Sequence, residues 1–183
     1  VYGIGCAADN PEAVAAVLAA KGRGRQMPPP VLVASADAID SLCVDVPDYA
    51  RRLARAFWPG GLTLILKARP DLGWDLGETG GTIGVRMPAQ EALLALLTDV
   101  GPMAVTSANL TGQPPATSVD QALGYFGTRV GAYLDAGPTK GSTASSIVDC
   151  AHGTPRVIRL GTISLDDLSQ AAGVSIDAPQ GGN

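Results

Sequence analysis

The chain has 183 residues, of which 46% are hydrophobic and only 4% aromatic. This is enough apolar material for one core, so we expect a single domain, and a core of aliphatic residues favours the α/β class, in which helices cover buried strands. The 13 basic and 17 acidic side chains give a formal net charge of −4, which disfavours a protein that grips nucleic acid through its phosphates.

The predicted elements of the first half alternate between strands and helices. Val1–Gly5 has the pattern of a strand end that runs into a glycine turn, so we expect an N-terminal segment upstream that this chain lacks. Further along we predict a helix over 11–21 capped by Asn10, a strand over 31–33, helices over 35–42 and 48–57, a strand over 62–66, a surface loop over 69–81 and a strand over 82–86.

The second half continues the theme of strand, polar loop and helix. We predict a helix over 90–100, a strand over 103–106, a helix over 118–126, short strands over 132–134, 145–148 and 156–159, and a closing helix over 164–172. The domain is expected to span residues 1–175. Residues 176–183 are rich in Gly, Pro and Gln and are predicted to form a flexible tail.

The cysteines indicate neither a metal site nor a disulfide framework. Cys6, Cys43 and Cys150 lie far apart without a CxxC spacing, and His152 is the one histidine. We interpret the three as buried small apolar residues in a reducing compartment. Because no apolar run approaches the ~18 residues that span a bilayer and no signal-peptide pattern is present, we expect a soluble, cytoplasmic protein.

One group of cations stands against the net charge of the chain. Lys21, Arg23 and Arg25 fall within five residues, and no acidic side chain occurs between Glu12 and Asp37. The intervening glycines would let these cations converge on an anion such as a triphosphate. A solvated basic helix end that offsets the helix dipole has the same pattern, so the spacing alone leaves both interpretations open.

Hydroxyl and amide groups cluster at the ends of predicted strands. Thr106–Asn109 follows the strand over 103–106, at the usual place for a ligand in an open α/β sheet, although a turn followed by a helix cap has the same pattern. Thr82 and Arg86 bracket another strand, where Arg86 fits either a carboxylate clamp or a surface charge.

Two familiar catalytic designs are absent from the sequence. The hydroxyls of Ser142–Ser146 have no acid or base beside them, and the single histidine makes a Ser-His-Asp nucleophile hard to assemble. A GxxxxGK[ST] phosphate loop is also missing, so an ATP site would need another design.

Seven segments taken together resemble the YrdC-like threonylcarbamoyl-AMP synthase family. No single segment is specific, but their order and spacing are. The segments are Val1–Gly5, similar to the tail of a PTDTVYGLG motif, Lys21–Arg23 (KxR), Phe57–Gly60 (FWPG), Gly84–Pro88 (GVRxP), Ser107–Gly112 (SxN), Ser145–Asp149 (STVVD) and Ile158–Gly161 (RxG). Two departures stand out: the PTDT portion, which in the family supplies a threonine-contacting hydroxyl, is absent, and Met27 stands where many relatives have lysine.

The resemblance implies a twisted mixed sheet around a deep, positively lined cavity. It also implies a nucleotidyltransferase that uses Mg²⁺ with ATP, L-threonine and bicarbonate to form threonylcarbamoyl-AMP and pyrophosphate, for N6-threonylcarbamoyladenosine modification of tRNA. Catalysis would rest on alignment and charge stabilisation. Downstream tRNA threonylcarbamoyl-transfer proteins are the implied partners, with no tight nucleic acid binding and no membrane.

The resemblance also assigns roles to individual residues. Lys21, Arg23, Ser107 and Asn109 would form the catalytic group. Arg23, Thr82, Ser107, Asn109 and Arg159 would bind ATP, Arg86 and Ser145 would bind threonine, and no protein ligand for the metal is implied.

Two other functions are compatible with the same motifs. A noncatalytic RNA-binding YrdC-like module is opposed by the net charge of −4, because one cavity with a few cations suits a nucleotide better than a phosphate backbone. A carbamoyl-transfer domain of the hydrogenase-maturation type shares the KxR and SxN elements, but it sits in a longer multidomain chain with zinc-finger cysteines.

Overall fold

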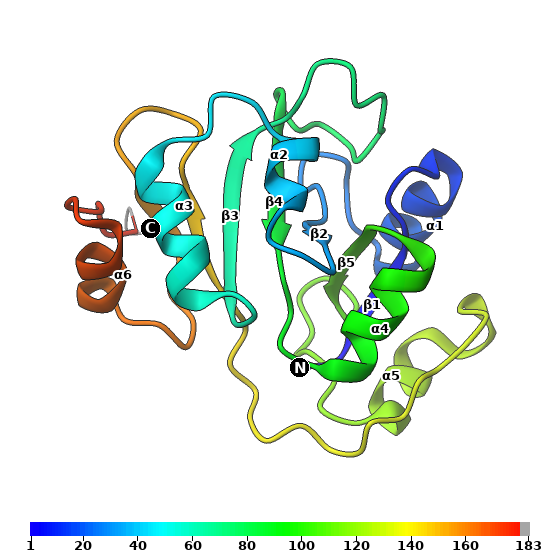
Figure 1. Ribbon diagram of the computed structural model, residues 1–183. Helices are drawn as coiled ribbons and strands as arrows, with labels where there is room; N and C mark the ends of the chain where they lie inside the picture. The colour runs from blue at the N-terminus through cyan, green and yellow to red at the C-terminus, as the bar shows by residue number, and fades with distance from the viewer. Residues whose placement is uncertain (180–183) are drawn as a thin grey trace.

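The computed structural model describes residues 1–179 and has a mixed seven-stranded sheet with helices packed against it (Figure 1). The strands are β1 (Gly3–Ala7), β2 (Val31–Leu32), β3 (Leu62–Lys67), β4 (Thr82–Arg86), β5 (Met103–Ser107), β6 (Ser146–Asp149) and β7 (Arg156–Arg159). The helices are α1 (Pro11–Lys21), α2 (Ala38–Leu42), α3 (Asp48–Phe57), α4 (Glu91–Val100), α5 (Val119–Phe126) and α6 (Leu165–Ala172). The α/β class and the single domain are confirmed.

The strands lie in the order β1-β5-β2-β4-β3-β6-β7. The pairs β2–β4 and β3–β6 are parallel, and the other neighbours are antiparallel. The central strand β2 contributes only Val31 and Leu32 to its ladders with β4 and β5. The sheet therefore consists of two groups of strands, β1–β5 and β4–β3–β6–β7, joined through a two-residue strand.

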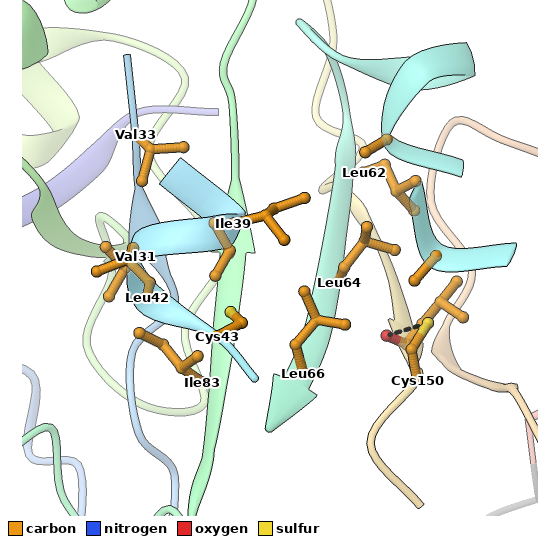
Figure 2. Close-up of a cluster of buried hydrophobic side chains, with 14 of the residues drawn as sticks. Val31, Val33, Ile39, Leu42, Cys43, Leu62, Leu64, Leu66, Ile83 and Cys150 are labelled. Carbon is orange, nitrogen blue, oxygen red and sulfur yellow. Dashed lines mark hydrogen bonds between the residues drawn. The ribbon is translucent and has the colours of Figure 1, made fainter. Parts of the chain in front are cut away.

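Alternation along β3 separates the core from the opposite face of the sheet. Leu62, Leu64 and Leu66 are fully buried and face the cluster that includes Ile39 and Cys43 (Figure 2). Burying a leucine side chain contributes roughly 1.5–3 kcal/mol, so these alternate positions determine which face of β3 is covered. Thr63, between them, points to the other face.

A smaller cluster packs α1 and α5 against the β1–β5 edge of the sheet. It contains Ile4 of β1, Val17 of α1 and Phe126 of α5, and both helices lie beside this edge in Figure 1. The predicted cap at Asn10 is confirmed, because its side chain accepts a hydrogen bond from Ala13 N, and α1 ends at Gly22 in the left-handed conformation. This cap fixes where Lys21 and Arg23 leave the helix.

Two sequence predictions about local structure are wrong. Val1–Gly5 does not end in a glycine turn, because β1 continues to Ala7. Its glycines permit a close approach instead: a Cβ on Gly5 would lie 2.6 Å from a methyl group of Val105 on the neighbouring strand. The predicted strand over 132–134 is absent; the segment is irregular and its Leu134 is 70% exposed.

The chain remains packed beyond the end of α6. Ile176 is buried, and the backbone of Asp177 forms an isolated parallel β-bridge with Arg156 of β7. These residues begin the segment predicted as a flexible tail, whose last part, 180–183, lies outside the described residues. Of the cysteines, Cys43 and Cys150 are buried and Cys6 is half-buried. Among the described helices none is long and apolar enough to span a membrane.

Candidate active site

Lys21, at the end of α1, is tied to the turn that follows β5. Its ammonium group donates to Asn109 O at 2.7 Å, to Asn109 Oδ1 at 3.3 Å and to Ser107 O. The side chain is only 2% exposed, and burial, together with the charge of Arg23, lowers the pKa of Lys21 to about 8. Because all three N–H donors have protein partners, Lys21 holds this turn together instead of presenting free donors to a ligand.

The Asn109 side chain completes the same unit. Its Oδ1 accepts a hydrogen bond from Ser107 Oγ at 2.6 Å, and its Nδ2 donates to Leu110 O and Gln113 O, each at 2.9 Å. The sequence-predicted group of Lys21, Ser107 and Asn109 is therefore one hydrogen-bonded cluster. Its geometry is set before any ligand arrives.

Arg23 differs from Lys21 because part of its guanidinium group is unpaired. One terminal nitrogen donates to Thr106 Oγ1 at 2.8 Å, but the buried Nε has no partner among the described residues. Burial, and secondarily the charge of Arg159, lowers the pKa of Arg23. A buried N–H without an acceptor is uncommon in native proteins and costs free energy, so Arg23 is suited to receive an anion.

Arg86 and Ser145 lie in a second part of the site, beyond the narrow β2. Both line a cavity of about 280 Å³, in which Arg86 Nε donates to Gly60 O at 2.8 Å. Burial, and then the charge of Arg159, lowers the pKa of Arg86. Its terminal nitrogens have no hydrogen-bond acceptor within the described part of the chain. Figure 1 shows the connection from α5 to β6, which carries Ser145, passing along this end of the molecule.

Arg159 connects the two parts. Its Nε donates to Ser145 O at 3.0 Å and its Nη2 to Ser145 Oγ at 3.2 Å. The charge of Arg159 lowers the pKa of both Arg23 and Arg86, so each of these two guanidinium groups lies within electrostatic range of Arg159. Among the ion pairs of residues 1–179, none involves these three arginines or Lys21. The result is a concentration of positive charge with no acidic partner.

The structure does not group Thr82 with the other seven predicted residues. Thr82 stands at the opposite end of β4 from Arg86, and its hydroxyl donates to Thr79 O at 2.8 Å. It lines a separate cavity of about 600 Å³, formed mainly by the loop between β3 and β4. Although this cavity is the larger one, its cations Lys67 and Arg69 are already paired with aspartates, so we place the active site at the smaller cavity.

Gly161 supports the part of the site that holds Ser145. A Cβ at this position would lie 2.2 Å from Ala144 O and 2.5 Å from Ser145 C, and Gly161 N donates to Ser146 Oγ at 2.9 Å. The glycine of the RxG segment is therefore needed because the chain after β7 passes directly against the backbone that presents Ser145.

Sequence reasoning named Thr106 only as part of the Thr106–Asn109 group and missed Thr63 altogether. Thr106 accepts the hydrogen bond from Arg23, and the Thr63 hydroxyl lies 3.3 Å from Ser145 Oγ. Thr63 carried a signal, since it is the one polar residue in the otherwise apolar run Leu62–Leu66. Within residues 1–179, no cluster of three or more His, Cys, Asp or Glu side chains could hold a metal ion.

Comparison with known proteins gives the same fold and a consistent set of relatives. Residues 1–161 match the Sua5_yciO_yrdC family, described as "Telomere recombination". A putative threonylcarbamoyl-AMP synthase of Mycobacterium leprae is 52% identical over 95% of this chain and 79% of its own length. A protein of the same description from Mycobacterium tuberculosis (strain CDC 1551 / Oshkosh) is 49% identical over 95% of this chain and 80% of its own length.

A solved structure with a bound amino acid is also similar to this chain. The crystal structure of P. abyssi Sua5 complexed with L-threonine has a TM-score of 0.87 and 31% sequence identity. The match covers 96% of this chain but 52% of that one, so this chain spans about half the length of Sua5.

Proposed function

This chain belongs to the Sua5_yciO_yrdC family, and from that premise we propose that it is a threonylcarbamoyl-AMP synthase. It would be a nucleotidyltransferase that joins L-threonine, bicarbonate and ATP for the modification of tRNA. The observation that carries the proposal is that Arg23 and Arg86 both lie near Arg159 and that none of the three has an acidic partner among residues 1–179. Such a site fits a triphosphate beside the carboxylate of an amino acid.

The two parts of the site suit the two substrates. Arg86 and Ser145 line a cavity of about 280 Å³, a size that suits a single amino acid. The terminal nitrogens of Arg86 would donate hydrogen bonds to its carboxylate. Arg23, beside the Ser107–Asn109 turn, would receive the phosphates. Arg159 would bind the nucleotide from its position between the two. The L-threonine complex of P. abyssi Sua5, which has a similar fold, supports threonine as a ligand.

The reaction requires no covalent bond to the protein. The threonine amine forms an N–C bond to the carbon of bicarbonate as a C–O bond breaks and water leaves, which gives an N-carboxylated amino acid. One of its new carboxylate oxygens attacks the α-phosphorus of ATP. An O–P bond forms as the bond from the α-phosphorus to the bridging oxygen breaks, and pyrophosphate leaves with the electron pair. The arginines align two anions that otherwise repel each other, and they stabilise charge on the phosphorus oxygens in the transition state.

Mg²⁺ would enter this site with ATP. No acidic side chain lines the cavity that contains Arg86, and proteins generally hold Mg²⁺ through one or two carboxylates together with substrate phosphates. Three oxygens of the Ser107–Asn109 turn already accept hydrogen bonds from Lys21, so Ser107 Oγ is the oxygen of this turn that would complete the metal's coordination. Mg²⁺ would neutralise phosphate charge, while the residues of this chain bind and orient both substrates.

We infer that the enzyme works in the cytoplasm, where its labile product would pass to tRNA threonylcarbamoyl-transfer proteins. The similarity to relatives described as synthases favours this function over a noncatalytic RNA-binding module.

Release of pyrophosphate tests the function directly. We expect the purified protein to release pyrophosphate from ATP and Mg²⁺ only when threonine and bicarbonate are both present. Serine and valine in place of threonine serve as substrate controls. Equal release without threonine would refute the synthase activity.

A further inference from the structure

Thr63 is a buried polar residue on β3 whose hydroxyl lies against that of Ser145, a residue that lines the proposed threonine pocket. It is 2% exposed, and its Oγ1 lies 3.3 Å from Ser145 Oγ. In the ladder between β3 and β4, Leu64 pairs with Val85, so Thr63 stands one position further along, level with Arg86. Thr63 thus lies beneath two residues that we assign to threonine binding.

The other hydrogen bonds of Thr63 and Ser145 indicate which of the two hydroxyls is the donor. Ser145 Oγ already accepts a hydrogen bond from Arg159 Nη2 at 3.2 Å. If Ser145 also gave its hydrogen to Thr63, the hydrogen of Thr63 would be left without an acceptor among the described residues, in a buried position where this is costly. If Thr63 donates instead, Ser145 Oγ accepts from both neighbours and its own hydrogen points into the cavity that Ser145 lines.

We propose that Thr63 is a positioning residue for the synthase reaction, because its donated hydrogen bond turns the Ser145 hydroxyl into a donor aimed at a carboxylate oxygen of the substrate. This inference rests on the proposed function. The distance of 3.3 Å is long for a hydroxyl pair, and such contacts often tighten only when substrate is bound. Thr63 itself does not contact the substrate; it acts through Ser145.

The test is a double-mutant cycle on the whole chain, with KM for threonine as the measured quantity. Thr63→Val keeps the shape of the side chain but removes the hydroxyl, and we expect KM for threonine to rise about fivefold, the scale of one neutral hydrogen bond. KM for ATP should stay within about twofold of the wild-type value. Thr63→Ser, which retains the hydroxyl, should restore most of the affinity.

Coupling between the two residues distinguishes positioning from a general effect on stability. In a Ser145→Ala background, Thr63→Val should cause no further rise in KM, because the hydroxyl that it orients is gone. Thr98→Val is the matched control, since it removes a hydroxyl hydrogen bond to Leu94 O in α4, away from the site. Thr63→Ala repeats the test if the valine variant folds poorly.

The outcomes separate this inference from the function on which it rests. Equal effects of Thr63→Val in the wild-type and Ser145→Ala backgrounds, or an unchanged KM for threonine, would overturn the positioning role while leaving the synthase activity intact. Wild-type protein that shows no threonine-dependent release of pyrophosphate would overturn both.

Discussion

Lys21 is buried and Arg23, two residues further on, is half-buried, and replacing each of these cations by methionine should affect stability differently. Methionine approximates the length of either side chain without its charge or its donors. Lys21 makes three hydrogen bonds to oxygens of Ser107 and Asn109, whereas Arg23 makes one to Thr106 and leaves a buried Nε unpaired. Lys21→Met therefore removes the hydrogen bonds that join α1 to the turn after β5, while Arg23→Met removes a charged group that is only partly hydrogen-bonded.

The size of the Lys21 effect follows from two opposing contributions. The fall in the pKa of Lys21 from 10.5 to about 8 corresponds to about 3 kcal/mol of penalty on the charged form from burial and from the charge of Arg23. Hydrogen bonds from a charged donor contribute about 1.5–3 kcal/mol each, so even at the lower end of this range three of them exceed the penalty by roughly 1–2 kcal/mol. For a domain of this size, a loss of roughly 1–2 kcal/mol lowers Tm by about 2–8 °C.

Thermal unfolding followed by circular dichroism, with pyrophosphate release as the parallel assay, would measure both variants. We expect Lys21→Met to lower Tm by that amount and Arg23→Met to leave Tm unchanged or raise it. Both should lose synthase activity, Arg23→Met through ATP binding. A Lys21→Met protein as stable as the wild type, or an Arg23→Met protein equally destabilised, would refute our division of roles between the two cations.

Three further predictions concern the other parts of the site. Arg86→Ala should raise KM for threonine by about 10–100-fold, because the charged hydrogen bonds to the threonine carboxylate are lost, while KM for ATP changes little. Steady-state kinetics with each substrate varied would measure both constants. An unchanged KM for threonine would show that another residue binds the carboxylate. Above pH 8 we expect kcat/KM for ATP to fall, because Lys21 loses its proton near its pKa of about 8 and one positive charge beside Arg23 disappears. The pH profile of Lys21→Met should lack this fall in kcat/KM. A matching fall in that variant would assign the titration to another group. Gly161→Ala should weaken threonine binding, measured by calorimetry, and lower Tm, because the new Cβ would lie 2.2 Å from Ala144 O. Unaltered threonine affinity would show that Gly161 does not position the backbone of Ser145.

The pH prediction has a counterpart in stability. The folded-state pKa of Lys21 is below its ordinary value of 10.5, so between about pH 8 and 10.5 the unfolded chain binds the extra proton. The contribution of this group to the free energy of unfolding therefore increases as pH rises through that range. Activity and stability should respond to the titration of Lys21 in opposite directions.

Features that depend on a few neighbouring residues could be predicted from the sequence. The cap at Asn10 and the strand Arg156–Arg159 were correct because capping residues and apolar runs act locally. The glycines of Val1–Gly5 were misinterpreted because their reason lies across the sheet, at Val105. The predicted strand over 132–134 has no neighbouring strand with which to pair.

The site was predicted as a set of residues, and its internal division of labour was not. The resemblance named the cations and hydroxyls, and the structure brings seven of the eight together, leaving Thr82 at the far end of β4. That Lys21 is occupied by backbone carbonyls, while Arg23 is not, depends on where α1 meets the turn after β5. No sequence pattern encodes that distance, and the contact of Thr63 with Ser145 depends on register in the same way.

The short central strand β2 has a mechanical consequence for this enzyme. Arg23 and the Ser107–Asn109 turn, assigned to the phosphates, stand on the β1–β5 side of it. Arg86 and Ser145, assigned to the amino acid, stand on the β4–β7 side together with the nucleotide-binding Arg159, so the two reactants meet across the narrowest part of the sheet. Besides the ladder pairs of Val31 and Leu32, hydrogen bonds from Val33 N to Arg86 O and from Val105 N to Pro30 O join the two groups of strands there. Because the two substrates would lie on opposite sides of this short strand, the packing around β2 would set the gap between the attacking oxygen and the phosphorus.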